Sequence, residues 1–285
     1  MHTGAGIAAF PTSEIFASHP GLAARLRGVR HVALDMDGTI YRGGQLFEFT
    51  NRFLDQLTEW DIGWTFLTNN SSKSTEEYQA HLRKLGVRAG EGRVFISTHA
   101  TIEYLRQRHP EVRRLYVLGS PGMRTELALA GFEITGESAE DEPEAVIVGF
   151  DPAMTYASLC RAAWWIRKGK WFVASHPDTV CPTDGPTVLV DCGAICAALT
   201  AATGRSPDAV AGKPHPRMLE GLMQRLGLNP ERMAMAGDRL NTDIEMARRA
   251  GALGVLVLTG EDTVEEAAQA QPPPDLVVPD LAAFG

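Results

Sequence analysis

The sequence lacks the features that mark membrane-spanning and secreted proteins. No apolar run approaches the roughly 18 consecutive residues that a membrane-spanning helix needs. A secretory signal has a positively charged start and a longer apolar segment, but no Lys or Arg precedes the short apolar stretch 7–10. We therefore expect a cytoplasmic protein without a membrane partner.

Positively charged residues are also scarce. The chain of 285 residues has 27 Lys and Arg against 35 Asp and Glu, which gives a formal net charge of -8. Such a chain has no basic field to attract the backbone of nucleic acids, so we expect no nucleic-acid partner. An anionic substrate would need local help from a cation, a lysine or backbone N–H groups.

Cysteine is rare, and its spacing is not that of a zinc site. The four cysteines, Cys160, Cys181, Cys192 and Cys196, lie in one part of the chain, but none of them forms a CxxC pair. Structural zinc sites usually have such pairs or closely spaced histidines. We therefore interpret the four cysteines as buried, reduced thiols.

The sequence does contain a regular alternation of short apolar runs and longer amphipathic segments. This alternation predicts an α/β fold with a doubly wound, Rossmann-like parallel sheet. Residues 12–27 are expected to form an N-terminal helical extension. Strands are expected at 31–34, 63–67, 114–118, 145–148, 171–174, 209–211, 233–236, 254–258 and 276–278. Helices are expected at 51–60, 75–85, 98–108, 124–130, 156–167, 216–226 and 242–250.

Polar side chains follow four of the expected strands, at the point where each apolar run ends. They are Asp35 and Asp37 after the first run, Thr68, Asn69 and Asn70 after the second, Lys213 after the third, and Asp238 with Asp243 after the fourth. Alone, each cluster would fit an ordinary turn, loop or helix start. Ligands of open parallel sheets bind beyond the carboxyl ends of the strands, so the four together predict one site.

The residue types in these clusters point to phosphoryl transfer. Asp35 and Asp37 are two residues apart, so in extended backbone their side chains point to the same side. With Asp238 they offer the oxygen-rich ligand set that Mg²⁺ accepts. Lys213 supplies a positive charge against a phosphate dianion, and the hydroxyl and amide groups of the second cluster can donate to phosphate oxygens.

These residues also resemble the motifs of a known family. The segments Asp35–Thr39, Thr68–Asn70 and Gly237–Asp238, with Lys213 and Asp243, are similar to the four motifs of the haloacid dehalogenase (HAD) superfamily. The resemblance is closer still to its NagD-like, class IIA phosphatases, and it extends from about residue 29 to the end of the chain.

The resemblance implies a role for each carboxylate. Asp35 would be the nucleophile and a ligand of Mg²⁺. Asp37 would protonate the leaving oxygen and later deprotonate water, with its backbone carbonyl on the metal. Asp238 would bind the metal directly, and Asp243 would bind it through water or support the other ligands. Dehalogenases of the superfamily lack the second carboxylate, so Asp37 favours a phosphatase.

The resemblance also implies roles for the donors. Thr68, Asn69 and Asn70 would hold phosphoryl oxygens, and Lys213 would neutralise the phosphate and orient the nucleophile. About 145 residues separate Thr68 from Lys213, which is enough for an inserted domain. We therefore expect a HAD core at 1–78 and 206–285, with an α/β cap of the C2 type at 79–205.

Substrate selection is expected in the cap, where the sequence departs from the NagD-like pattern. Relatives have Asn-Pro-Asp and a Pro-Gly-Ala-Gly-like segment where this chain has 175–178 and 190–194. His176 and Asp178 are candidate substrate-binding residues, although a histidine in a loop can also simply face solvent. Contact between the substrate and Asp191 or Cys192 is left open. The pair Trp164–Trp165 is interpreted as cap core or as a dimer interface.

The sequence thus predicts a Mg²⁺-dependent phosphatase for a small phosphorylated metabolite, of the sugar phosphate, nucleotide, phosphoglycolate or 4-nitrophenyl phosphate type. Two alternatives remain. One is a phosphotransferase that passes the phosphoryl group to an alcohol, and the other is a non-catalytic ligand sensor with the same fold. The physiological substrate and the oligomeric state stay open, with a homodimer as one alternative.

Overall fold

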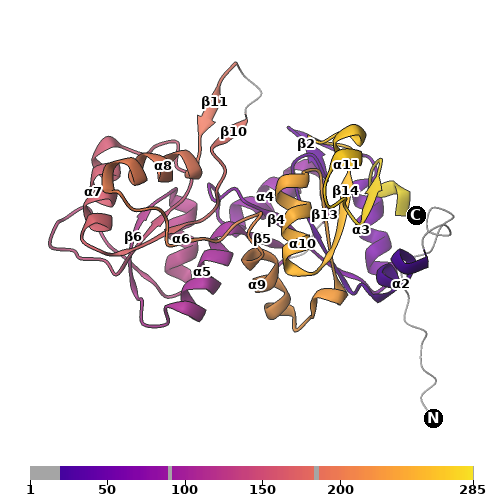
Figure 1. The fold of residues 1–285 in the computed structure, drawn as a ribbon, viewed down its shortest axis with the longest axis horizontal. Coiled ribbons are helices and arrows are strands. Elements are labelled where there is room, and N and C mark those ends of the chain that lie inside the picture. The colour runs from indigo at the N-terminus through magenta and orange to yellow at the C-terminus, as the bar shows by residue number, and fades with distance from the viewer. Residues whose placement is uncertain (1–19, 89–91, 183–185, 285) are drawn as a thin grey trace, which may run out of the picture. The chain divides into compact units, whose positions relative to one another are not determined.

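The computed structural model describes residues 20–88, 92–182 and 186–284, in two compact units (Figure 1). Unit 1 contains the chain up to Leu67, residues 81–94 and residues 222–285. Unit 2 contains residues 68–80 and 95–221. The core and cap boundaries inferred from the sequence differ from these bounds and stay a prediction. Among the described residues, no helix is both long enough and apolar enough to cross a membrane.

Unit 1 is built around a six-stranded sheet with the order β15-β14-β13-β1-β4-β5. The strands are β1 (His31–Leu34), β4 (Gly63–Thr68), β5 (Val94–Ile96), β13 (Met233–Gly237), β14 (Leu253–Val257) and β15 (Leu276–Val278). The chain first builds outward from β1 through β4, and later from β13 in the opposite direction. The strand order therefore reverses between β1 and β13, which is where open parallel sheets bind ligands.

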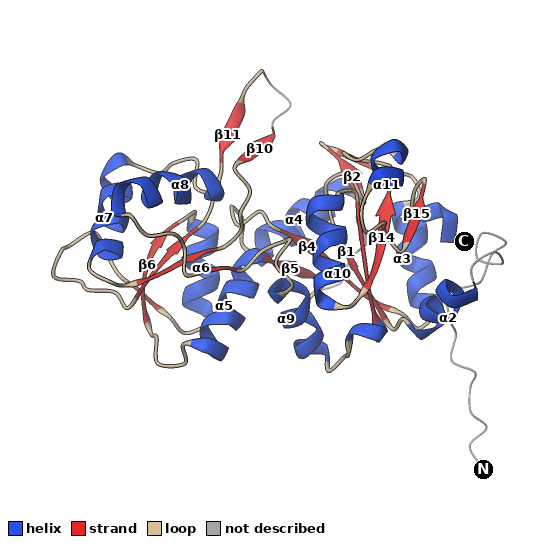
Figure 2. Ribbon diagram, in the orientation of Figure 1, coloured by secondary structure: helices blue, strands red, loops and turns tan. Residues whose placement is uncertain are grey.

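Helices surround the strands of unit 1, as Figure 2 shows in blue and red. They include α2 (Pro20–Gly28), α3 (Thr50–Glu59), α10 (Glu245–Ala250) and α11 (Val264–Gln269), with a short helix at Leu281–Phe284. The buried residues of α3 are spaced so that one face of the helix packs inward, and Phe53 contacts Phe284 with ring centroids 5.9 Å apart. The spacing of the apolar residues in α3 thus explains which face of this helix packs toward the interior of unit 1.

The helix α2 covers part of the segment in which the sequence predicts an N-terminal helical extension. Ala23 and Leu26 are buried, and Arg25 forms an ion pair with Asp275, so this helix packs on unit 1. The rest of the expected extension, residues 12–19, lies outside the described residues.

Unit 2 has its own five-stranded sheet with the order β12-β9-β8-β6-β7. The strands are β6 (Arg114–Leu118), β7 (Glu133–Ile134), β8 (Ala145–Val148), β9 (Trp171–Ala174) and β12 (Ala209–Val210). The helices are α5 (Ser97–Arg108), α6 (Pro121–Leu129), α7 (Tyr156–Arg167) and α8 (Cys192–Thr203), while α4 (Thr75–Leu85) and α9 (Arg217–Leu226) each run across a boundary between the units.

Alternating residues of the unit 2 strands supply two separate cores. Leu115 and Val117 of β6 join one apolar cluster, and Tyr116 and Leu118 join the other. Successive side chains of a strand point to opposite faces, so both faces of this sheet are buried. Trp165 belongs to the second core, as interpreted from the sequence, whereas Trp164 is 47% exposed.

Some elements of unit 2 differ from the expectation. The helix α6 begins at Pro121, three residues early, because the Ser120 hydroxyl accepts a hydrogen bond from Met123 N and caps it. The bounds of α8 were not predicted, since its sequence is apolar almost throughout and has no amphipathic spacing. The short hairpin of β10 (Val180–Pro182) and β11 (Val188–Val190) was also missed.

The cysteines are all free, but the interpretation of four buried thiols is wrong for one of them. Cys192 and Cys196 are buried in α8, and Cys181 is half-buried. Cys160 is exposed, because it lies on the outer face of α7. The spacing of apolar neighbours around Cys160 does not distinguish the two faces of that helix.

One buried carboxylate of unit 2 connects α6 with the first residues of α4 and with α5. Glu126 of α6 accepts hydrogen bonds from Thr75 N at the start of α4 (2.5 Å) and pairs with His99 Nε2 of α5 (3.1 Å). Burial alone would raise the pKa of Glu126, but the bonds from His99 and Thr75 lower it to about 2. The ionised form is therefore the one that the fold stabilises.

We expect Glu126→Gln to lower the free energy of unfolding by about 1–3 kcal/mol at pH 7, the cost of a disrupted buried polar contact. The carboxylate stabilises the fold above its unfolded pKa of about 4.5, and this contribution is lost as the pH falls toward about 2. The difference between wild type and variant in urea unfolding should therefore shrink from pH 7 to pH 3. Exposed Glu76 in the first turn of α4 is the matched control, and Glu76→Gln should change little. An equal difference at both pH values would contradict this role of Glu126.

Candidate active site

Three carboxylates gather in unit 1 at the carboxyl ends of β1 and β13. Asp35 follows β1 directly, Asp238 follows β13, and Asp243 lies five residues further along. One oxygen atom of each carboxylate lies within 4.8 Å of the others. Asp238 and Asp243 are buried, and Asp35 is half-buried. Carboxylates this close repel one another, and a divalent cation is the usual way to relieve the repulsion.

Backbone pairing brings the first two carboxylates together. Leu34 of β1 lies opposite Ala236 of β13, and Asp35 N donates to Ala236 O at 2.8 Å. Both strands are parallel, so they end at the same edge of the sheet. The predicted cluster that contains Asp35 therefore lies next to the predicted cluster that contains Asp238.

A wide helical turn brings Asp243 back toward the other two. Residues Leu240–Ile244 form a π-helical turn, in which the amides of Asp243 and Ile244 both donate to Arg239 O (3.1 and 3.2 Å). Such turns are rare in proteins, and those that do occur lie frequently at functional sites. The sequence predicted a regular helix from residue 242, so the π turn is a correction: the α-helix α10 begins only at Glu245.

The carboxylates pack against bare backbone. A Cβ atom at Gly38 would lie 2.3 Å from Asp238 Oδ2, and one at Gly260 would lie 1.9 Å from the same atom. A Cβ atom at Gly237 would lie 2.3 Å from Asp243 Cγ. Only glycine fits at these three positions, which keeps the carboxylates close together. The compact set of hard oxygen donors is one that Mg²⁺ accepts, so the residues present fit this ion.

Asp37 lies beside this group, but its carboxylate is not part of it. The turn after Asp37 is closed by a hydrogen bond from Gly38 N to Tyr41 O (2.8 Å), with Gly38 in the left-handed region at φ +81°. Burial raises the pKa of Tyr41, and the charges of Asp37 and Asp35 raise it further. The Tyr41 phenol therefore stays neutral beside both carboxylates.

One charged neighbour of the group was missed in the sequence. Burial would lower the pKa of Arg239, but the negative charges of Asp238, Glu261 and Asp35 raise it overall. Its guanidinium also contacts Glu261 Oε1 at 3.3 Å. In the sequence, Arg239 is marked only by its position directly after Asp238. A Gly-Asp-Arg segment alone does not distinguish an active-site arginine from a surface one.

Unit 2 brings together three other predicted residues. Asn69 Oδ1 accepts a hydrogen bond from Lys213 N (2.8 Å), and Asn69 Nδ2 donates to Lys213 O (3.0 Å). The same Nδ2 donates to Asp178 Oδ2 (3.0 Å). Asn69 and Lys213 are 7% and 5% exposed. The second and third predicted clusters are therefore joined through the backbone of Lys213.

The other polar residues after β4 form a tight local turn. Thr68 Oγ1 accepts from Asn70 N (3.2 Å), and Asn70 Oδ1 accepts from Ser72 N (2.8 Å). Ser71 is fully buried, with Phe150 N donating to its hydroxyl and Ser120 donating to its carbonyl oxygen. Side chains of unit 2 therefore fix the conformation of this turn.

His176 is buried, so the alternative of a solvent-facing ring is wrong. Its Nδ1 contacts Ser175 Oγ at 2.8 Å, and its Nε2 contacts Asp191 Oδ1 at 2.9 Å. Burial would lower the pKa of His176, but Cys192 and the hydrogen-bonded Asp191 raise it to about 9. The contact between His176 and Asp191 lies at the start of α8. The His176 side chain has 0% exposed surface, and this burial does not favour a contact with substrate. Such a contact stays a prediction.

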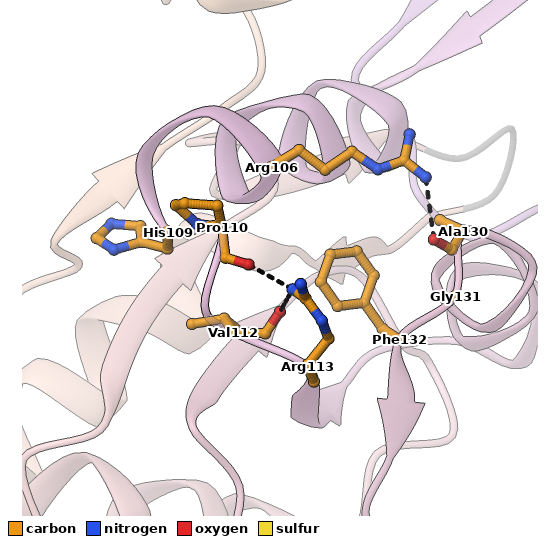
Figure 3. Close-up of a pocket in the computed structure, with 8 residues that line it drawn as sticks. All are labelled: Arg106, His109, Pro110, Val112, Arg113, Ala130, Gly131 and Phe132. Carbon is orange, nitrogen blue, oxygen red and sulfur yellow. Dashed lines mark hydrogen bonds between the residues drawn. The ribbon is translucent and has the colours of Figure 1, made fainter.

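A cavity of about 280 Å³ elsewhere in unit 2 is lined by residues that the sequence did not single out, with Arg106, His109 and Arg113 among them (Figure 3). Two arginines reach toward it, but their guanidinium groups donate to backbone carbonyls near the ends of α5 and α6. Arg106 donates to Ala130 O (3.0 Å), and Arg113 donates to Pro110 O and Val112 O (2.5 and 2.9 Å). Cations at helix C-termini offset the negative end of the helix dipole, which accounts for both residues.

Family models match both ends of the chain. A model of haloacid dehalogenase-like hydrolases matches residues 32–133, and a HAD-hydrolase-like model matches residues 210–284. An acid sugar phosphatase of Staphylococcus aureus is 32% identical over 248 residues, which cover 87% of this chain and 93% of that protein. The chain belongs to the HAD superfamily.

Solved structures refine this assignment to the NagD-like phosphatases. A 4-nitrophenylphosphatase from Thermotoga maritima is 38% identical, with a TM-score of 0.82 over 89% of this chain and 95% of that one. A glycerol phosphate phosphatase from Mycobacterium tuberculosis, solved in complex with magnesium, is 32% identical, with a TM-score of 0.82 over 90% of this chain and 77% of that one. This HAD protein is thus a phosphoric monoester hydrolase with an α/β fold of parallel sheets, and the alternative of a non-catalytic sensor is not supported.

Proposed function

We propose that this phosphatase depends on Mg²⁺ and hydrolyses small organic phosphate monoesters through an aspartyl-phosphate on Asp35. The three-carboxylate group of unit 1 carries the proposal, because it supplies a nucleophile and a metal site at the same strand ends. When held by Asp35, Asp238 and Asp243, Mg²⁺ would neutralise negative charge on the phosphoryl group.

In the first step, a carboxylate oxygen of Asp35 forms a bond to phosphorus as the bond from phosphorus to the ester oxygen breaks. The leaving oxygen takes its proton from the carboxyl group of Asp37. Lys213 holds a positive charge against the phosphoryl oxygens, and the Thr68 hydroxyl donates a hydrogen bond to one of them. This is covalent catalysis by a carboxylate.

In the second step, a water oxygen attacks phosphorus and the bond from phosphorus to Asp35 breaks. Asp37, now ionised, takes a proton from that water, so both carboxylates return to their starting state. Splitting hydrolysis into two displacements lets one acid–base group serve both steps.

For the substrate, we infer a sugar phosphate or polyol phosphate first. The named relatives include an acid sugar phosphatase and a glycerol phosphate phosphatase, and each resembles this chain at 32% identity. A small hydrophilic leaving group also suits a chain with no basic field for larger polyanions. We propose that the enzyme is cytoplasmic. A homodimer remains a prediction, and analytical ultracentrifugation of the purified chain would test it.

A phosphate-release screen tests the proposal. The purified chain is incubated with sugar phosphates, glycerol phosphates, nucleotides, phosphoglycolate and 4-nitrophenyl phosphate, each with and without Mg²⁺. We expect release from some of the esters only with the metal present. Added alcohols that accumulate as new phosphate esters would indicate the phosphotransferase alternative, and no release from any ester with Mg²⁺ would contradict the proposed function.

A further inference from the structure

The side chain of Asn69 is fully engaged by the polypeptide backbone and by Asp178. Its carbonyl oxygen accepts from Lys213 N, and its amide nitrogen donates both to Lys213 O and to Asp178 Oδ2. These partners decide which end of the amide is oxygen, because Lys213 N can only donate and the carboxylate can only accept. The amide thus brackets both backbone polar groups of Lys213.

The bracket is held from three sides within unit 2. Ser97 Oγ at the start of α5 donates to Asn69 O at 2.6 Å. A Cβ atom at Gly212 would lie 2.6 Å from Asn69 Oδ1, so only glycine permits the close approach. Gly193 N at the start of α8 donates to Asp178 O at 2.7 Å, which fixes the loop that carries the carboxylate.

We propose that Asn69 is a positioning residue: its side-chain amide fixes the backbone of Lys213, and Asp178 orients that amide. The inference rests on the proposed role of Lys213 in phosphoryl transfer. It gives Asn69 a function through the lysine, so that the side-chain amide holds no phosphoryl oxygen itself. It also makes Asp178 a support of the catalytic lysine instead of a reader of the leaving group.

A double-mutant cycle separates these roles. We expect Lys213→Ala to lower kcat/KM by about a thousandfold, the scale of a lost charge-stabilising group. Asn69→Ala should lower it by about a hundredfold, the scale of a misplaced catalytic group. If Asn69 acts through Lys213, the double variant should lie within about threefold of Lys213→Ala. Independent contacts with the phosphate would multiply instead, to a loss of about 10⁵-fold.

Two further readouts distinguish positioning from damage to the fold. The Mg²⁺ concentration for half-maximal activity should not change in Asn69→Ala, because Asn69 is not one of the three carboxylates that would hold the metal. Asn51 is the matched control, since its amide also brackets a loop backbone, donating to Gly86 O (2.9 Å) and accepting from Arg88 N (3.0 Å). Asn51→Ala should leave kcat/KM within about twofold.

A second double-mutant cycle tests the part of Asp178. If Asp178 orients the amide of Asn69, Asp178→Ala should lower kcat/KM by about tenfold in the wild type and by less than about threefold in Asn69→Ala. Equal losses in the two backgrounds, or no loss in the wild type, would overturn the orienting role of Asp178.

The outcomes also separate this inference from the proposed function. If Lys213→Ala is strongly impaired and the losses of kcat/KM in the two single variants multiply in the double variant, Asn69 does not act through Lys213. That result would overturn the role of Asn69 and leave the proposed function intact. If Lys213→Ala kept full activity, both would fail, since the lysine would then have no catalytic role for Asn69 to support.

Discussion

Replacing Asp35 with asparagine should lower kcat by at least about a thousandfold, with the fold intact. Asparagine is nearly the same size, so packing after β1 is kept, but its amide is a poor nucleophile and a poorer ligand for a divalent cation. Phosphate release from 4-nitrophenyl phosphate measures the effect, and thermal unfolding checks the fold. No phosphoryl group should be trapped on the variant after an acid quench.

Asp55→Asn is the control for this change. Asp55 lies on α3 of unit 1 and is exposed, where it pairs with Arg88, so its replacement should leave kcat unchanged. A folded Asp35→Asn protein that retained a tenth of the wild-type rate would rule out the covalent intermediate on this residue.

Removal of divalent metal should reduce activity to background, and Mg²⁺ should restore it. Without a cation, the negative charge of Asp35, Asp238 and Asp243 would repel an incoming phosphate dianion. We expect Asp238→Ala to be inactive at ordinary Mg²⁺ concentration and to be rescued in part at high concentration. Ca²⁺ should inhibit, because it is larger and accepts extra ligands, which disturbs in-line attack.

Titration of Mg²⁺ into EDTA-treated enzyme measures this dependence directly. Asp280→Asn serves as the control, since that carboxylate caps Ala282 N far along the chain from the acidic group. Its half-saturating Mg²⁺ concentration should equal that of the wild type. Full activity of the wild type in EDTA would exclude the proposed metal site.

The strands that carry the active-site clusters could be predicted because each is a short, mainly apolar run with no exposed residue. His31–Leu34 and Met233–Ala236 are fully buried, and the apolar composition of these two segments alone predicts that burial. The parallel pairing of these runs then brings Asp35 and Asp238 together without further information. The family motifs added the assignment of roles, which composition alone does not give.

Other features could not be predicted because they depend on contacts between distant segments. The burial of His176 arises from Asp191, fifteen residues away, and from Gly212 behind it. The bracket between Asn69 and Lys213 joins residues 144 positions apart. Arg239 gains its environment from Glu261 on another loop. The residues next to each partner in the sequence therefore give no sign of these pairings.

The glycines behind the acidic group restrict how this enzyme can diverge. At Gly38, Gly237 and Gly260 the Cβ atom of any larger residue would lie 2.3 Å or less from an atom of a carboxylate group, so the backbone or the carboxylate would have to move. The wall behind these carboxylates is therefore main chain at three positions, and a substitution there would displace a proposed metal ligand before it could supply a new one. A change of metal preference through this wall would have to alter the path of the loops themselves.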